Sequence, residues 1–123
     1  MQITGSQNER TAPGVVEVVV PDLRLALLFY TQLGFVIERQ TPTFVTLRWE
    51  EMFFFLAENP QAPTAQRWTN VRIIVPNVDA VWDHVNRLGL PVRTPIADRP
   101  YGLRDFTVND PAGFEVRFAQ VLA

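Results

Sequence analysis

An internal repeat is the strongest constraint that this sequence places on its fold. The stretch Val20–Phe35 recurs without a gap, 55 residues later, as Val75–Leu90. Four pairs of positions are identical, and the apolar runs that precede the two copies fall into the same register: Val20/Val75, Pro21/Pro76, Leu33/Leu88 and Gly34/Gly89. One supersecondary unit is therefore used twice in the chain.

Each copy predicts a strand followed directly by a helix. An apolar run rich in β-branched residues ends at a proline, which lacks a backbone donor and stops a strand. An Asp or Asn that can cap a helix start follows, and a glycine stands where the helix would end. Apolar residues at helical spacing give each helix one face to bury. The proline, the capping residue and the glycine are Pro21, Asp22 and Gly34 in the first copy, and Pro76, Asn77 and Gly89 in the second.

The remaining strand-like runs complete two βαβββ modules, so the expected fold class is α+β. Residues 1–14 form a lead-in, residues 15–58 the first module, 59–67 a linker with two prolines, and 68–123 the second module. In the first module, strands are expected at 15–20, 35–40, 44–49 and 52–57, and a helix at 22–33. In the second, strands are expected at 70–75, 91–94, 103–108 and 114–121, with a helix at 78–88 and a long loop at 95–102.

Composition excludes several kinds of chemistry. The chain has no Cys or Lys, one His and one Ser among 123 residues. Disulfides, thiolate nucleophiles and lysine Schiff bases are therefore excluded, and the one serine, Ser6, lies in the polar N-terminal tail, where it is poorly placed to act as a nucleophile. The net charge is −2 and the arginines are scattered, so a nucleic-acid partner is not expected. No apolar run approaches membrane-spanning length and the N-terminus lacks a signal-peptide pattern, which predicts a cytoplasmic protein without a membrane partner.

A four-stranded sheet with its helix on one face leaves the other face open. Two such modules can set their open faces toward each other and form a cupped sheet around a cleft, which is the default ligand site. Strand alternation turns Glu17, Arg72 and Arg117 toward this cleft. In the repeat, Glu17 and Arg72 are equivalent, and two interpretations stay open: an ion pair between the two central strands, or a polar anchor for a ligand.

The repeat and a second motif resemble the vicinal oxygen chelate superfamily, which contains glyoxalases, extradiol dioxygenases and bleomycin resistance proteins. The motifs are V-P-D-L-x-x-A-L-x-F-Y-x-x-L-G-F at Val20–Phe35, its second copy, and Y-G-L-R-D-F-T-V-N-D-P-A-G at Tyr101–Gly113. The similarity covers about residues 15–120. It implies the paired-module fold, and it leaves the function open because members share architecture and differ in substrate.

Metal-dependent members of that superfamily place four ligands on strands 1, 4, 5 and 8. The corresponding residues here are Val15, Phe55, Asn70 and Arg117. Valine and phenylalanine offer no lone pair and arginine would repel a cation, so no metal and no cofactor are expected. A register error of one residue would instead recruit Glu17, Glu58 and Glu115.

Without these metal ligands, the chain resembles the metal-free bleomycin-resistance branch of the superfamily. This resemblance implies a homodimer that binds a small molecule, such as an antibiotic or toxic compound, in an aromatic-lined cleft. It also implies that the protein has no catalytic residues. The alternatives are a metal-dependent lyase, isomerase or dioxygenase that uses noncanonical carboxylates, and a structural or regulatory module with a vestigial cleft. The single histidine, His84, is interpreted as a packing residue. The predicted ligand-binding residues are Glu17, Trp49, Phe53, Phe55, Arg72, Tyr101, Arg104 and Arg117.

Overall fold

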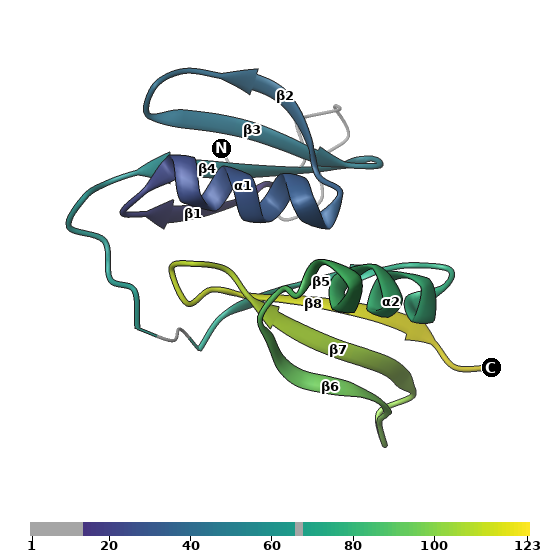
Figure 1. Ribbon diagram of the computed structural model, residues 1–123. Coiled ribbons are helices and arrows are strands. Elements are labelled where there is room, and N and C mark those ends of the chain that lie inside the picture. Colours follow the sequence, from purple (N-terminus) through teal and green to yellow (C-terminus); the bar gives the residue numbers. More distant parts are fainter. Residues whose placement is uncertain (1–13, 66–67) are drawn as a thin grey trace, which may run out of the picture.

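A computed structural model describes residues 14–65 and 68–123 of the chain. It confirms two βαβββ modules (Figure 1). The predicted lead-in lies almost entirely outside the described residues, and so do two residues of the predicted linker. The first module contains β1 (Val16–Val20), α1 (Leu23–Leu33), β2 (Val36–Gln40), β3 (Phe44–Trp49) and β4 (Met52–Glu58). The second contains β5 (Asn70–Ile74), α2 (Val78–Leu88), β6 (Val92–Asp98), β7 (Leu103–Asn109) and β8 (Glu115–Val121).

The two sheets have equivalent strand orders, β1-β4-β3-β2 and β5-β8-β7-β6. In each sheet the last three strands pair antiparallel, whereas the first strand lies parallel to the last. The last strand can lie parallel to the first because the helix that follows the first strand crosses over one face of the sheet. β1 and β5 are therefore edge strands of separate sheets, and the expectation that they are the two central strands is wrong.

β6 is longer than the sequence predicts. It extends to Asp98, through Pro95, so the long loop expected at 95–102 shrinks to a short turn between Asp98 and Leu103. β6 is the edge strand of its sheet, and its register shifts between Thr94 and Ala97. An edge strand tolerates proline because one side of the strand needs no backbone donor.

Both helices have the caps that the repeat predicts. The Asp22 side chain accepts a hydrogen bond from the Leu25 amide at 3.1 Å, and Asn77 accepts one from the Ala80 amide at 3.2 Å. Gly34 and Gly89 end the helices with positive φ angles, 125° and 65°. The same local chemistry is thus used at both ends of both helices.

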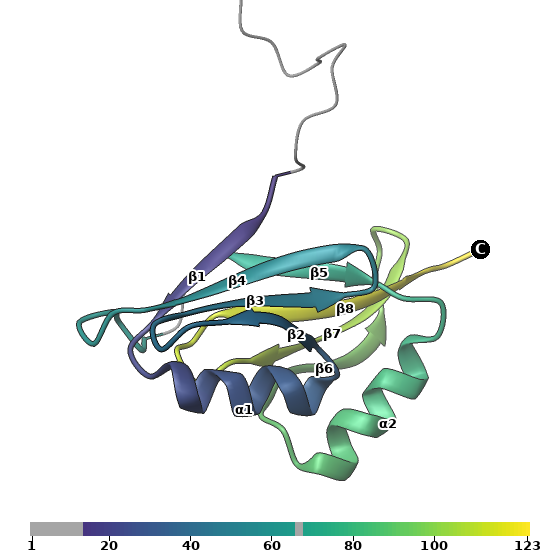
Figure 2. The ribbon, with the colours of Figure 1, turned by 90° about the horizontal axis from the view of Figure 1, so that it is seen from above.

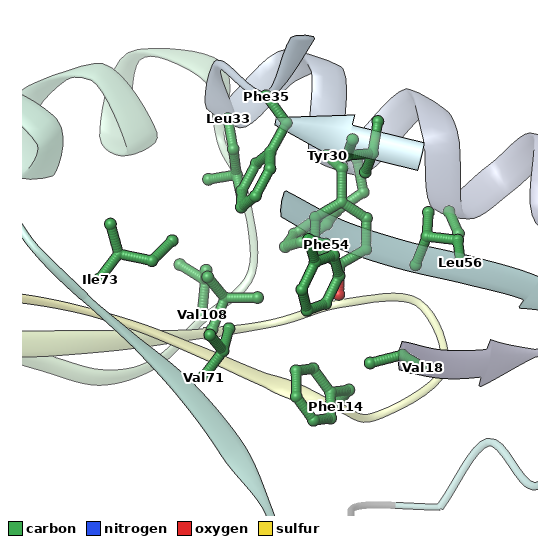
Figure 3. Packing of buried hydrophobic residues seen from close by; sticks show 14 of the residues in the cluster. Val18, Tyr30, Leu33, Phe35, Phe54, Leu56, Val71, Ile73, Val108 and Phe114 are labelled. Carbon is green, nitrogen blue, oxygen red and sulfur yellow. The ribbon is translucent and has the colours of Figure 1, made fainter. Parts of the chain in front are cut away.

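One hydrophobic core joins the modules. Phe54 of β4 packs against Phe114 with ring centroids 6.1 Å apart, and Trp49 packs against Phe118 of β8 at 5.3 Å. The fully buried Tyr30 of α1 lies beside Phe54 in this contact region (Figure 3). The helix-covered faces of the two sheets, here called the inner faces, therefore share a single interior.

The opposite faces of the sheets, here called the outer faces, consequently point away from each other. Both helices lie along one side of the molecule, at the bottom of Figure 2, and the strands lie above them in that view. Because the inner faces are in contact, one chain cannot also bring its outer faces together. Among residues 14–65 and 68–123, the cleft expected between two open faces is therefore not formed within a single chain.

The single histidine ties the two helices together. Nε2 of His84 in α2 lies 2.7 Å from the backbone oxygen of Gln32 near the end of α1. The neighbouring Trp82 packs against Phe106 with ring centroids 5.1 Å apart. His84 therefore joins the two helices, and Trp82 packs on the inner side of the second sheet.

Candidate functional site

The outer face of the first sheet carries an aromatic cluster. Phe53 and Phe55 both lie on this face, whereas Phe54 between them is fully buried on the inner face. The Phe53 residue is 40% exposed, and the Phe55 ring meets the Phe44 ring edge-on at 5.1 Å. Glu17 of β1 stands beside Phe55 in the strand register. An exposed aromatic group of this kind is suited to contact with a flat apolar molecule.

Phe44 was missed by sequence analysis. It occupies the first position of β3 and lies opposite Ala57 in the pairing of β3 with β4. Strand alternation counted from the β3–β4 turn could have placed it on the face of Phe53 and Phe55. The antiparallel register supplies that signal.

The outer face of the second sheet is charged. Arg72 of β5 and Arg117 of β8 are direct register partners, and Thr107 of β7 stands on the other side of Arg117. The Arg72 guanidinium lies 5.6 Å from the centre of the Tyr101 ring, which suits a cation–π contact. Three of the predicted site residues, Arg72, Arg117 and Tyr101, are therefore brought together here.

A buried carboxylate organises this charged face. Asp105 of β7 is only 2% exposed. Its two oxygens accept hydrogen bonds from the Tyr101 hydroxyl at 2.5 Å and from Nε of Arg99 at 2.8 Å. Burial by itself would raise the pKa of Asp105, but these two hydrogen bonds and the nearby arginines outweigh it and lower the pKa. Asp105 is thus an anion that holds Tyr101 and Arg99 in place.

The hydrogen bond to Asp105 also raises the pKa of Tyr101, because the donated proton is held by a charged acceptor. Burial and the Asp105 charge act in the same direction. Asp105 and Arg99 were not predicted as site residues. Nothing in their local sequence pattern indicates that Tyr101, which lies in the turn four positions before Asp105, folds back onto β7.

Two predicted site residues lie elsewhere. Trp49 is on the inner side, where its ring contacts Phe35 and Phe118, each at 5.3 Å. It also lines a groove of about 460 Å³ between the β3–β4 turn and β5, which Arg72 borders. Arg104 points to α2, where its Nη2 lies 3.0 Å from Oδ1 of Asp79. Neither residue belongs to an outer face.

Glu17 and Arg72 do not form the ion pair that the repeat suggested. The ion pairs found within residues 14–65 and 68–123 do not join them, and their strands belong to different sheets.

Three of the four residues at the family metal positions do not fit a divalent cation. The side chains of Val15 and Phe55 carry no donor atom, and Arg117 carries a fixed positive charge. Glu58, one of the alternative carboxylates, accepts a hydrogen bond from the Leu23 amide at 3.0 Å. In the part of the chain that the structure describes, no group of three or more His, Cys, Asp or Glu side chains is placed to hold a metal ion.

The fold and the two outer faces define a protein of the paired βαβββ class. Residues 12–118 match the family model of the glyoxalase/bleomycin resistance protein/dioxygenase superfamily, and the chain belongs to this superfamily. A search among curated protein sequences found no match.

Solved structures share the fold. A glyoxalase/bleomycin resistance protein/dioxygenase from Alicyclobacillus acidocaldarius has a TM-score of 0.80 at 17% identity, covering 95% of this chain and 96% of that one. A bleomycin resistance determinant encoded on transposon Tn5 has a TM-score of 0.78 at 15% identity, covering 90% and 98%. A bleomycin-binding protein complexed with bleomycin has a TM-score of 0.75 at 16% identity, covering 89% and 98%. No helix within the described ranges is long and apolar enough to cross a membrane.

Proposed function

We propose that this protein binds a small, flat organic molecule and sequesters it, as a protective protein against an antibiotic or toxic compound would. The observation that carries the proposal is the aromatic cluster of Phe44, Phe53 and Phe55 on the outer face of the first sheet. Aromatic rings offer contact area and stacking without needing an acid, base or nucleophile. A protein of this fold has been solved as a bleomycin-binding protein complexed with bleomycin, and this similarity supports the proposal.

The binding cleft is proposed to form between two copies of the chain. In one chain the two outer faces point away from each other, so each face lacks an opposite wall. One face is aromatic and the other is charged, and joining the first sheet of one copy to the second sheet of another would give the cleft an apolar wall and a polar wall. A two-fold homodimer then contains two equivalent clefts.

Binding is proposed to need no metal ion. The support is chemical: the family ligand positions hold residues such as Phe55 and Arg117, which do not bind divalent cations. A sequestering protein stabilises its ligand through contacts alone, whereas the metal-dependent reactions of this superfamily require a site for the metal. The same residues therefore favour binding over catalysis.

The binding proposal is tested with phenylnaphthylamine, an uncharged aromatic dye whose fluorescence rises in apolar sites. We expect saturable binding in buffer containing a metal chelator. The double variant F53A/F55A should weaken it roughly tenfold or more, since each truncation removes a large aromatic contact. L28A is the matched control, because Leu28 is exposed on α1, away from either outer face. Equal effects of the two changes would reject the aromatic face as the site.

The dimer proposal has a separate test. Light scattering after size-exclusion chromatography should give twice the chain mass of 14.0 kDa. A monomer at the concentrations used for dye binding would contradict a two-chain cleft. Dye binding by that monomer would then assign the site to a single outer face.

A further inference from the structure

On the charged face of the second sheet, two arginines lie side by side, and in the described part of the chain they do not each have a carboxylate within hydrogen-bond distance. Arg72 and Arg117 are register partners on the parallel strands β5 and β8, so their side chains leave the sheet at neighbouring points of the same face. The Arg117 side chain is 24% exposed, and Arg72 is exposed. Two like charges this close repel each other unless an anion lies between or above them.

The carboxylates of this face are engaged by other groups. Asp105 accepts hydrogen bonds from Arg99 and Tyr101, at 2.8 and 2.5 Å. Glu115 accepts one from Nε of Arg93 at 2.9 Å, and its other oxygen stands 3.9 Å from Nη2 of Arg117, beyond hydrogen-bond distance. The ion pairs of the described residues thus leave Arg117 with only a distant partner.

Two further observations indicate that this place is built for a ligand. Nε of Arg117 is buried and has no hydrogen-bond partner among the described residues. A buried donor without a partner is costly, and a ligand oxygen is one way to satisfy it. Across the described part of this face, the arginines at 72, 93, 99 and 117 also outnumber the carboxylates Asp105 and Glu115, so the face is positive.

We propose that Arg72 and Arg117 form a subsite for an oxyanion, and that the ligand of this protein is an aromatic molecule carrying a carboxylate, sulfonate or phosphate group. This proposal rests on the proposed binding function. The two guanidiniums supply several donors to one anionic group. The Tyr101 ring, held by Asp105 and lying under Arg72, offers a surface for the part of the ligand next to the anion.

Two related dyes separate the anion from the aromatic rings. Anilinonaphthalene sulfonate carries a sulfonate that phenylnaphthylamine lacks. We expect the sulfonate to bind the wild type more tightly. R72Q and R117Q should each weaken sulfonate binding roughly tenfold, the effect of losing one charge-assisted hydrogen bond, and this loss should clearly exceed any change in binding of the uncharged dye. R104Q is the control, since it removes the same charge from a side chain that pairs with Asp79 on the inner side.

The outcomes distinguish the two proposals. If both dyes bind with equal affinity and R72Q changes neither, the oxyanion subsite is wrong while the binding function stands. If R104Q weakens sulfonate binding as much as R117Q does, general charge attraction explains the preference and the subsite is again wrong. If neither dye binds, the proposed binding function fails.

In that last case a direct measurement still decides the subsite. NMR spectra of the arginine Nε–H groups are recorded while inorganic phosphate is added. Saturable shifts of the Arg72 and Arg117 signals, with Arg104 unchanged, would support the subsite without any dye. Signals that do not move, or that move equally for all arginines, would overturn it.

Discussion

The hydroxyl group of Tyr30 in α1 donates a 2.7 Å hydrogen bond to Oδ2 of Asp110, in the turn between β7 and β8. The bond is buried and joins the helix of the first module to the last hairpin of the second. Oδ1 of the same carboxylate accepts hydrogen bonds from the Ala112 and Phe114 amides, each at 2.8 Å. One carboxylate therefore both shapes the turn and fastens it to the other module.

We expect Y30F to lower the free energy of unfolding by roughly 1–3 kcal/mol, because it removes a buried hydrogen bond to a charged group without opening a cavity. Urea denaturation measures the change. Y101F is a matched control, since Tyr101 also donates to a carboxylate but is largely exposed, and Arg99 continues to pair with that carboxylate. A Y30F protein as stable as the wild type would show that the bond does not hold the modules together.

The turn after Asp110 also needs a glycine. Gly113 has a φ angle of 79°, and a Cβ atom there would stand 2.6 Å from the backbone oxygen of Ala65. Gly102 has a φ angle of 89° but open space around it. We expect G102A to cost about 1–2 kcal/mol from its backbone conformation alone. G113A should lower the free energy of unfolding clearly more than G102A does, as measured by thermal unfolding. Equal losses for the two variants would mean that the segment at Ala65 moves aside freely.

Stability should depend on pH through Asp105. Hydrogen bonds from Tyr101 and Arg99 lower its pKa in the folded protein below the ordinary value of 3.8. The stabilisation from this carboxylate is therefore complete above that value and is lost as the pH falls through the lowered pKa. Urea unfolding should show D105N less stable than the wild type at neutral pH, with the two converging in acid. A constant difference down to the acid limit would contradict this linkage.

Purified protein should contain little metal. After incubation with manganese, nickel, zinc or ferrous iron, elemental mass spectrometry is expected to give substoichiometric metal, and a chelator should leave the melting temperature unchanged. Near-stoichiometric metal that is lost in E17Q or E115Q would show that noncanonical carboxylates bind it. The search would then turn to a metal-dependent reaction.

Mixing two defective proteins tests the two-chain cleft. F53A/F55A damages the aromatic wall and R72Q/R117Q damages the charged wall, so each homodimer lacks an intact site. If the chains exchange, a mixed dimer contains one intact cleft, and about a quarter of all clefts should recover tight sulfonate-dye binding. No recovery, in a sample shown to contain mixed dimers, would place both walls in the same chain.

Local chemistry made the modules predictable. The caps at Asp22 and Asn77 and the glycines after both helices depend on neighbouring residues, so the repeat was enough to find them. Strand alternation likewise depends only on residue parity: it predicted that Arg72 lies on the open face of its sheet, and Arg72 is exposed there while the neighbouring Val71 is buried on the inner face. The prediction failed where the position of a strand in the sheet outweighs a local signal. The strand was predicted to end before Pro95, but β6 is an edge strand and continues through this proline.

The sequence by itself therefore determined that this protein consists of two equivalent modules and which strand residues share a face. Only the tertiary structure decided that the inner faces share one core and that the outer faces diverge. It also decided that Trp49 packs inward and that Asp105 gathers Tyr101 and Arg99. The physical reason is that these outcomes come from contacts between distant segments, whose geometry no local pattern contains.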